Sequence, residues 1–328
     1  MSNESAHTPS FLEPIPKTAT VVRLPSDGVP YKEGSPESTG RLSLNAMTMS
    51  DESRILNPEK GVSFSRSVDL VLQKCIQEVV DINSLLSADK FYLFMLLRAV
   101  TYGQEYSFTW ECGSTDEKKE VCGHENTASV KIPGDFQVKG LTKEDIEPFG
   151  VTLPVTGKTI SFRLGRGYDE IAVDKYEGEL AAKKKAGIMV ADTTPLYRLA
   201  RLVTAVDGNE ITKNVGISHV VSFINSLPAK DIAALKAQME YYTPGMNTEV
   251  SLYCEECRTM TKMDLPITVS FFRPDYFVRG EPVETKVRPD VLHGDVVPGD
   301  NEDGPTGTPV VSREAEGNQR GGDGARTA

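Results

Sequence analysis

The sequence predicts an α+β protein with N-terminal strands, an antiparallel helix pair and two cysteine-bearing β-hairpins. Three observations support this prediction. Apolar residues recur at helical spacing between residues 65 and 103, strands with alternating apolar residues adjoin two pairs of cysteines, and helical segments occupy the stretch between those pairs. We therefore expect hairpins at about 104–133 and 248–272, with a helical insertion over 134–247.

Both ends of the chain differ in composition from the folded body, which we expect over residues 18–275. Residues 1–17 hold three prolines among small polar side chains, and residues 281–328 contain no aromatic side chain. The latter segment has 10 acidic and 5 basic side chains, an acidic excess of 10 − 5 = 5. Such segments offer too little apolar surface to fold. We predict a disordered arm over 1–17 and a disordered acidic tail over 281–328.

The overall charge and hydropathy limit the classes of function. With 36 Lys+Arg against 47 Asp+Glu the formal net charge is −11, which argues against binding to the phosphate backbone of nucleic acids. The longest apolar run, residues 91–97, is too short to span a membrane. The first ten residues lack the basic start and the apolar centre of a signal peptide. These features predict a soluble protein in a reducing cytoplasm.

The body is expected to begin with two strands. β-branched and alternating apolar residues predict strands over Thr18–Leu24 and Gly40–Thr48. Ser50 then stands at an N-cap position, and the acidic residues after it favour a short helix that ends before Pro58.

Two longer helices follow. One is predicted over Ser65–Ile82 and the next from Ser87 to Gly103, because apolar side chains recur on one face of each. The connection over 83–86 is short, so the helices are expected to be antiparallel neighbours. Cys75 falls on the apolar face of the first helix, where a small core residue is expected.

The two hairpins and the insertion complete the body. Tyr106, Phe108 and Trp110 alternate with polar residues up to Cys112, and a second strand over Ala128–Ile132 follows Cys122. The later hairpin is predicted from strands on either side of Cys254 and Cys257, the second of them over Thr261–Phe272. Within the insertion we expect a strand over Thr159–Leu164 and helices over Tyr168–Lys185, Thr194–Val206, Ser218–Asn225 and Pro228–Tyr242.

The cysteines predict a metal site. Cys254-x-x-Cys257 at a hairpin tip can place two thiolates on one ion, and Cys112 and Cys122 can supply the remaining ligands of a tetrahedral four-sulfur zinc site, as in a zinc ribbon. Nine residues separate Cys112 from Cys122, so His124 is considered as a replacement ligand. With four protein ligands the zinc would be structural and would have no open position for a substrate.

The cysteines and a glycine-rich segment also admit other interpretations. The thiols could be reduced bystanders or a redox pair, although Glu255 and Glu256 are expected to raise the thiol pKa values and so to disfavour redox chemistry. Gly165-Arg166-Gly167 lacks the remaining features of a phosphate-binding loop and is interpreted as a simple turn. No set of side chains suggests a catalytic site, so we predict that the protein is not an enzyme.

Several short motifs follow one another in a characteristic order. They are Leu24-Pro-Ser-Asp-Gly28 with Pro30-Tyr31, Met47-Thr-Met-Ser-Asp-Glu52, the run from Leu85 to Arg98, Tyr102-Gly103 with Tyr106, Cys254-Glu-Glu-Cys257, Leu265-Pro266 and Phe271-Phe272. Taken together, this order resembles the baseplate hub and hub-assembly protein family of T-even-type contractile-tailed bacteriophages. The resemblance covers roughly residues 18 to 274.

The resemblance implies a non-enzymatic viral protein of the tail baseplate hub, either a virion component or an assembly factor. Its partners would be other hub or tail proteins or a second copy of itself, in the host cytoplasm during assembly or in the virion tail. Two rival functions remain open. One is a zinc-ribbon nucleic-acid-binding protein of transcription or processing, which the acidic residues around the cysteines disfavour. The other is an enzyme with an open metal site that uses His124.

Overall fold

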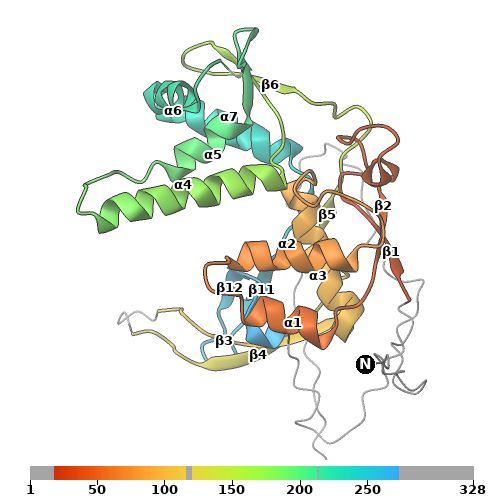
Figure 1. Ribbon diagram of the computed structural model, residues 1–328. Helices are drawn as coiled ribbons and strands as arrows, with labels where there is room; N and C mark the ends of the chain where they lie inside the picture. Colours follow the sequence, from red (N-terminus) through yellow and green to blue (C-terminus); the bar gives the residue numbers. More distant parts are fainter. Residues whose placement is uncertain (1–17, 116–119, 213, 273–328) are drawn as a thin grey trace, which may run out of the picture.

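The computed structural model describes residues 18–115, 120–212 and 214–272 of the chain (Figure 1). The arm predicted over 1–17 and the acidic tail predicted over 281–328 lie outside the described residues. The described part combines α-helices with five small antiparallel sheets, four of two strands and one of four. This confirms the α+β class.

The helices and strands have the following bounds. The helices are α1 Met49–Leu56, α2 Phe64–Cys75, α3 Ser87–Tyr102, α4 Gly167–Lys185, α5 Thr194–Leu202, α6 Ile217–Ser226, α7 Ala229–Tyr242 and α8 Val269–Phe272. The strands are β1 Thr20–Arg23, β2 Arg41–Leu44, β3 Glu105–Glu111, β4 Glu125–Lys131, β5 Val138–Lys139, β6 Phe149–Thr152, β7 Thr159–Phe162, β8 Val203–Val206, β9 Asn209–Glu210, β10 Gly245–Met246, β11 Glu249–Tyr253 and β12 Met260–Asp264.

Helix α3 lies at the centre of the core. Ten of its 16 residues are buried, including the polar side chains of Asp89, Lys90 and Arg98. It contacts β1, α2, α4, α8 and β10, so segments from the whole described chain pack around it. A helix that is apolar on most sides is expected to be buried in this way. Among its aromatic residues, Tyr92 and Phe94 are buried, Tyr102 is half-buried and Phe91 is 37% exposed.

The helix predicted over Ser65–Ile82 is shorter in the structure. Helix α2 ends at Cys75, which is fully buried as expected. The chain then runs alongside the end of β2, where the Asn45 amide donates to the Cys75 carbonyl and the Gln77 amide donates to the Ser43 carbonyl. Backbone pairing with a strand therefore replaces the last helical turns. Val79, predicted on the buried face, is 93% exposed.

The first helix also begins differently from the prediction. Its N-cap is Thr48, not Ser50: the Thr48 side chain accepts a hydrogen bond from the Asp51 amide, and the Asp51 side chain accepts one from the Thr48 amide. This reciprocal capping box ties the first turn of the helix to its N-cap residue.

The two ends of the insertion meet at its base. Strand β5 near its start pairs antiparallel with β10 near its end, and the Asn247 amide donates to the Gln137 carbonyl. The rest of the insertion contains the four-stranded sheet, which is formed by β6, β7, β8 and β9. Helix α7 packs against β6, and helix α5 packs against α4 and α6. Figure 1 shows helices α4 to α7 of this part, coloured green to cyan, above helices α1 and α2.

Two predicted elements change type along their length. The helix predicted over Thr194–Val206 stops at Leu202, and Val203–Val206 becomes β8 because it pairs with β7. The strand predicted over Thr261–Phe272 stops at Asp264, and the last described residues form the short helix α8. There Phe271 and Phe272 are fully buried against Phe94, so burial of these rings determines the local conformation.

Candidate metal centre

The hairpin of β3 and β4 positions Cys112 and Cys122. The two strands pair in register from Glu105↔Lys131 to Glu111↔Glu125. Beyond them the Cys112 amide donates to the His124 carbonyl at 2.9 Å, and the Gly123 amide donates to the Cys112 carbonyl at 3.0 Å. These bonds fold the end of the hairpin back on itself, so Cys122 returns close to Cys112 despite the nine residues between them.

The hairpin of β11 and β12 positions Cys254 and Cys257 in a tight turn. The Cys254 amide donates to the Thr259 carbonyl, and the Arg258 amide donates to the Cys254 carbonyl, each at 3.0 Å. Arg258 adopts a left-handed backbone conformation with φ of 58°. The turn directs both sulfurs to the same side, as a metal-binding knuckle requires.

The four sulfurs form a single cluster. All four Sγ atoms lie within 4.8 Å of one another, with 3.6 Å between Cys112 and Cys257 and 3.9 Å between Cys122 and Cys254. At a Zn–S distance of about 2.3 Å the edges of a regular tetrahedron are about 3.8 Å long. A disulfide needs about 2.05 Å between sulfurs, and no pair in the cluster is joined in this way. The residues present therefore fit a tetrahedral four-sulfur metal site.

The cluster lies partly at the protein surface. Cys112 and Cys254 are buried, Cys122 is half-buried and Cys257 is exposed. His124, considered as a replacement ligand, is not part of the four-residue group. Four sulfurs are enough for zinc without it.

Local hydrogen bonds favour the thiolate forms of the Cys254–Cys257 pair. Burial acts to raise the pKa of Cys254, but hydrogen bonds from the Cys257 amide, the Asn126 side chain and the Glu256 amide outweigh it and lower the pKa. Hydrogen bonds from the side chain and the amide of Thr259 are the main causes that lower the pKa of Cys257 to about 6. The pKa values of Cys254 and Cys257 are thus lowered and not raised as expected from Glu255 and Glu256, because hydrogen-bond donors to the two sulfurs determine the direction.

Cys122 behaves in the opposite way. A backbone hydrogen bond from His124 acts to lower its pKa, but burial and the three neighbouring cysteine side chains raise it to about 11. A metal ion must therefore displace the Cys122 proton, whereas Cys257 gives up its proton readily. Metal binding to such a set of thiols releases protons and weakens as the pH falls.

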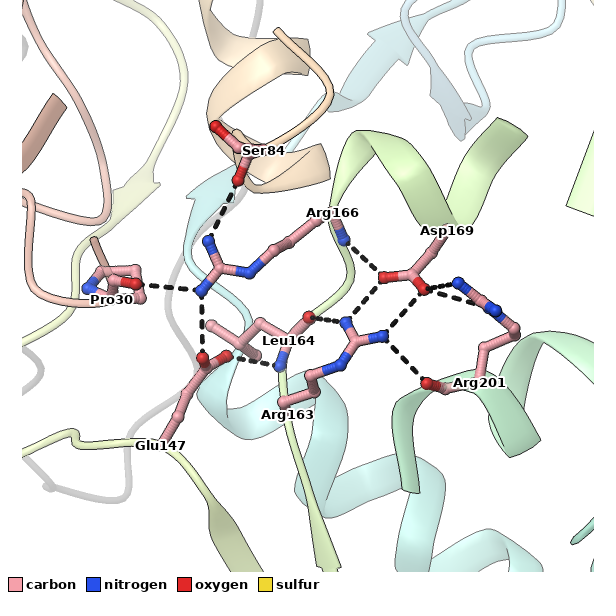
Figure 2. Close-up of polar contacts among 8 residues, drawn as sticks. All are labelled: Pro30, Ser84, Glu147, Arg163, Leu164, Arg166, Asp169 and Arg201. Carbon is pink, nitrogen blue, oxygen red and sulfur yellow. Dashed lines mark hydrogen bonds and ion pairs between the residues drawn. The ribbon is translucent and has the colours of Figure 1, made fainter. Parts of the chain in front are cut away.

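A second group of polar side chains lies where the insertion meets the N-terminal elements (Figure 2). The Asp169 carboxylate, in the first turn of α4, accepts hydrogen bonds from the guanidinium groups of Arg163 and Arg201, with N–O distances of 2.6 to 3.1 Å. It also accepts from the Arg166 amide. Burial acts to raise the pKa of Asp169, but Arg163 and these other donors hold the pKa below its ordinary value.

Arg166, interpreted from the sequence as part of a simple turn, connects three separate segments. Its guanidinium donates to the carbonyls of Pro30 and Ser84 and to the Glu147 carboxylate. The next residue, Gly167, is packed so closely that a Cβ atom there would lie 2.8 Å from the Asn83 Cα atom. Because these groups bind one another, the arrangement is structural. The sequence contained no spacing signal for it.

The chain was compared with known proteins. The model of the T4 bacteriophage base plate protein family matches residues 18–273. No curated protein and no solved structure matches the chain. Among the described residues, no helix combines the length and hydrophobicity needed to cross a membrane. Since the family match covers well over half of the sequence, the chain belongs to the T4 bacteriophage base plate protein family.

Proposed function

We propose that this protein takes part in building the central hub of the phage tail baseplate and that a structural zinc ion, held by Cys112, Cys122, Cys254 and Cys257, stabilises it. The observation that supports the zinc site is the convergence of four sulfurs within 4.8 Å of one another. Family membership supports the role in the baseplate. In this proposal the two hairpins form a zinc-ribbon-like module.

The zinc ion would join segments that are far apart in the sequence. Cys112 and Cys257 are separated by 145 positions, and the whole insertion lies between them. A link of this length restricts the unfolded chain and contributes several kcal/mol, on the order of the values known for long cross-links. We propose that residues 18–275 therefore form a single folded body, in which the pairing of β5 with β10 closes the base of the insertion over 134–247.

The proposed role is non-enzymatic and depends on contacts with other proteins. Four protein ligands complete the coordination of zinc and leave no place for a substrate. The partners would be other hub or tail proteins or a second copy of this chain. They would meet in the host cytoplasm during assembly, and the protein would either stay in the virion tail or leave after the hub forms.

A complementation experiment tests this function. A phage that cannot make this protein is grown in cells that supply the wild-type chain, the Cys254→Ser/Cys257→Ser double variant or the exposed-site control Asn209→Asp. We expect the wild type and the control to restore complete baseplates and the double variant to fail. Restoration of baseplates by the double variant at the wild-type level would contradict a need for the zinc site.

Two further measurements separate the proposal from its rivals. Mass spectrometry of purified particles beside infected-cell lysate distinguishes a virion component from an assembly factor. A gel shift with duplex or single-stranded DNA is expected to show no salt-dependent complex, because glutamates at 111, 120, 255 and 256 surround the cysteines in the sequence. A specific complex would favour the nucleic-acid-binding alternative.

A further inference from the structure

One buried amide side chain lies between the two hairpins at the sulfur cluster. Asn126 is the second residue of β4, directly opposite Trp110 of β3, and only 5% of its surface is exposed. A buried carboxamide is costly unless its donors and its acceptor are satisfied. The cost of its burial therefore depends on which groups bind the Nδ2 and Oδ1 atoms of Asn126.

Both ends of the Asn126 carboxamide have partners. Nδ2 donates to the His124 carbonyl at 3.0 Å and to the Cys254 Sγ atom at 3.6 Å, and Oδ1 accepts from the Glu255 amide at 3.0 Å. The Glu255 amide is a donor and the His124 carbonyl is an acceptor, so these contacts determine the orientation of the side chain. Asn126 thus connects the end of one hairpin to the knuckle of the other, 128 positions later in the chain.

We propose that Asn126 is a positioning residue of the metal site: its Nδ2–H group holds the Cys254 thiolate in place for the ion while its Oδ1 atom anchors the knuckle. The inference rests on the proposed zinc site. The Asn126 carboxamide joins the two hairpins at this sulfur through contacts at both of its ends. It also orients the sulfur before the ion arrives, as hydrogen bonds to metal ligands commonly do.

Two substitutions separate the roles of the two ends of the side chain. Asn126→Asp keeps the shape and an acceptor for the Glu255 amide, but it loses the donor to the Cys254 sulfur and to the His124 carbonyl and adds a negative charge. Asn126→Ala removes all three contacts. Asn209→Asp is the matched control, because Asn209 is exposed and bonds only within its own turn.

Zinc affinity is measured on the full chain by competition with a chromophoric chelator, and Co²⁺ is used as a spectroscopic probe of the thiolates. We expect Asn126→Asp and Asn126→Ala to weaken zinc binding about 10- to 100-fold and to shift the thiolate-to-Co²⁺ charge-transfer band. The Asn209→Asp control should match the wild type. An Asn126→Asp protein with wild-type affinity and spectrum would overturn the inference.

A measurement on the wild type keeps the test independent of folding in the variants. In the protein loaded with ¹¹³Cd²⁺, the Asn126 side-chain N–H is expected to show scalar coupling to the metal through the Cys254 sulfur. If cadmium binds but this coupling is absent, the positioning role is wrong. If the wild type binds neither zinc nor cadmium, the proposed zinc site itself fails, so the two failures are distinguishable.

Discussion

Two residues with left-handed backbone conformations follow the second cysteine of each pair. Gly123 follows Cys122 with φ of 63°, and Arg258 follows Cys257 with φ of 58°. Glycine adopts this conformation without the steric cost that other residues bear. In both hairpins the residue after the second cysteine therefore has a left-handed backbone conformation, and this residue is glycine in one hairpin and arginine in the other.

Gly123→Ala should lower the free energy of unfolding by about 1 kcal/mol, because alanine is strained at this φ. The new methyl group has room, since the nearest atom outside the turn is Glu111 Oε1 at 3.6 Å. Urea unfolding of the zinc-bound protein measures the change. The matched control is Gly178→Ala within helix α4, where the same substitution should raise stability by about 0.5–1 kcal/mol. Equal effects at both positions would contradict the argument.

Functional residues could be predicted from the sequence only where residues of one chemical type occur at a recognisable spacing. Cys254 and Cys257 form a recognisable pattern with two residues between them, and Cys112 and Cys122 were assigned to the same site because they lie at the tip of another predicted hairpin and complete four ligands. Asn126 and Asp169 belong to no such pattern. Their partners come from distant segments, so a lone Asn in a strand and a lone Asp in a first helical turn gave no signal.

At the scale of elements, one carboxylate connects three of them. Asp169 at the start of α4 binds Arg163, which directly follows β7, and Arg201 of α5 (Figure 2). The Asp169 side chain is 7% exposed, whereas the two arginines are 20% and 27% exposed. Removal of the acid would leave two partly buried cations without their partner, which is costly.

Asp169→Asn should therefore lower the free energy of unfolding by about 3 kcal/mol at pH 7. Glu177→Gln removes the exposed ion pair with Arg198 and should change stability by about 0.5 kcal/mol or less. Denaturant unfolding monitored by circular dichroism measures both values. Similar small effects for the two variants would show that the Asp169 group does not hold these elements together.

The same carboxylate predicts a pH dependence. The pKa of Asp169 is lower in the folded protein than the value of about 3.9 in an unfolded chain. Its stabilising effect is thus complete above that unfolded value and is lost as the pH falls through the lower folded value. Between pH 7 and pH 3 the stability difference between wild type and Asp169→Asn should shrink. A difference that stays constant down to pH 3 would contradict this assignment.

The centres of the helices were predictable and several of their ends were not. Helices α3, α4, α6 and α7 lie within two residues of their predicted bounds because apolar periodicity or clear punctuation marks them. The predicted ends of helices and strands are wrong where the backbone pairs with a distant strand or where side chains are buried in the core. Residues after Cys75 pair beside β2, Val203–Val206 pairs with β7, and Phe271 and Phe272 enter the core.

On the scale of the whole molecule, the two hairpins meet although an insertion of more than a hundred residues separates them. Figure 1 shows β3 and β4 beside β11 and β12 at one end of the structure, while the insertion lies at the other end. The α+β class and the family were predictable from the sequence. The meeting of the hairpins was inferred from ligand count alone, because spacing within each hairpin says nothing about the distance between them.

Removal of zinc should loosen the whole molecule. If the ion contributes about 4 kcal/mol, its loss corresponds to a fall in Tm of about 10 °C for a body of this size. Calorimetry with and without a strong chelator measures the shift, and added zinc should restore the original Tm. The Cys254→Ser/Cys257→Ser variant should unfold at the lower temperature in both conditions. An unchanged Tm after complete removal of the ion would show that zinc does not stabilise the fold.

The most direct test of the four-sulfur site is native mass spectrometry of the full chain purified under reducing conditions. We predict one zinc ion per wild-type chain, one in Asn209→Asp and none in Cys254→Ser/Cys257→Ser. A wild-type chain that carries no metal, with its four thiols reduced and zinc supplied, would contradict the proposed site.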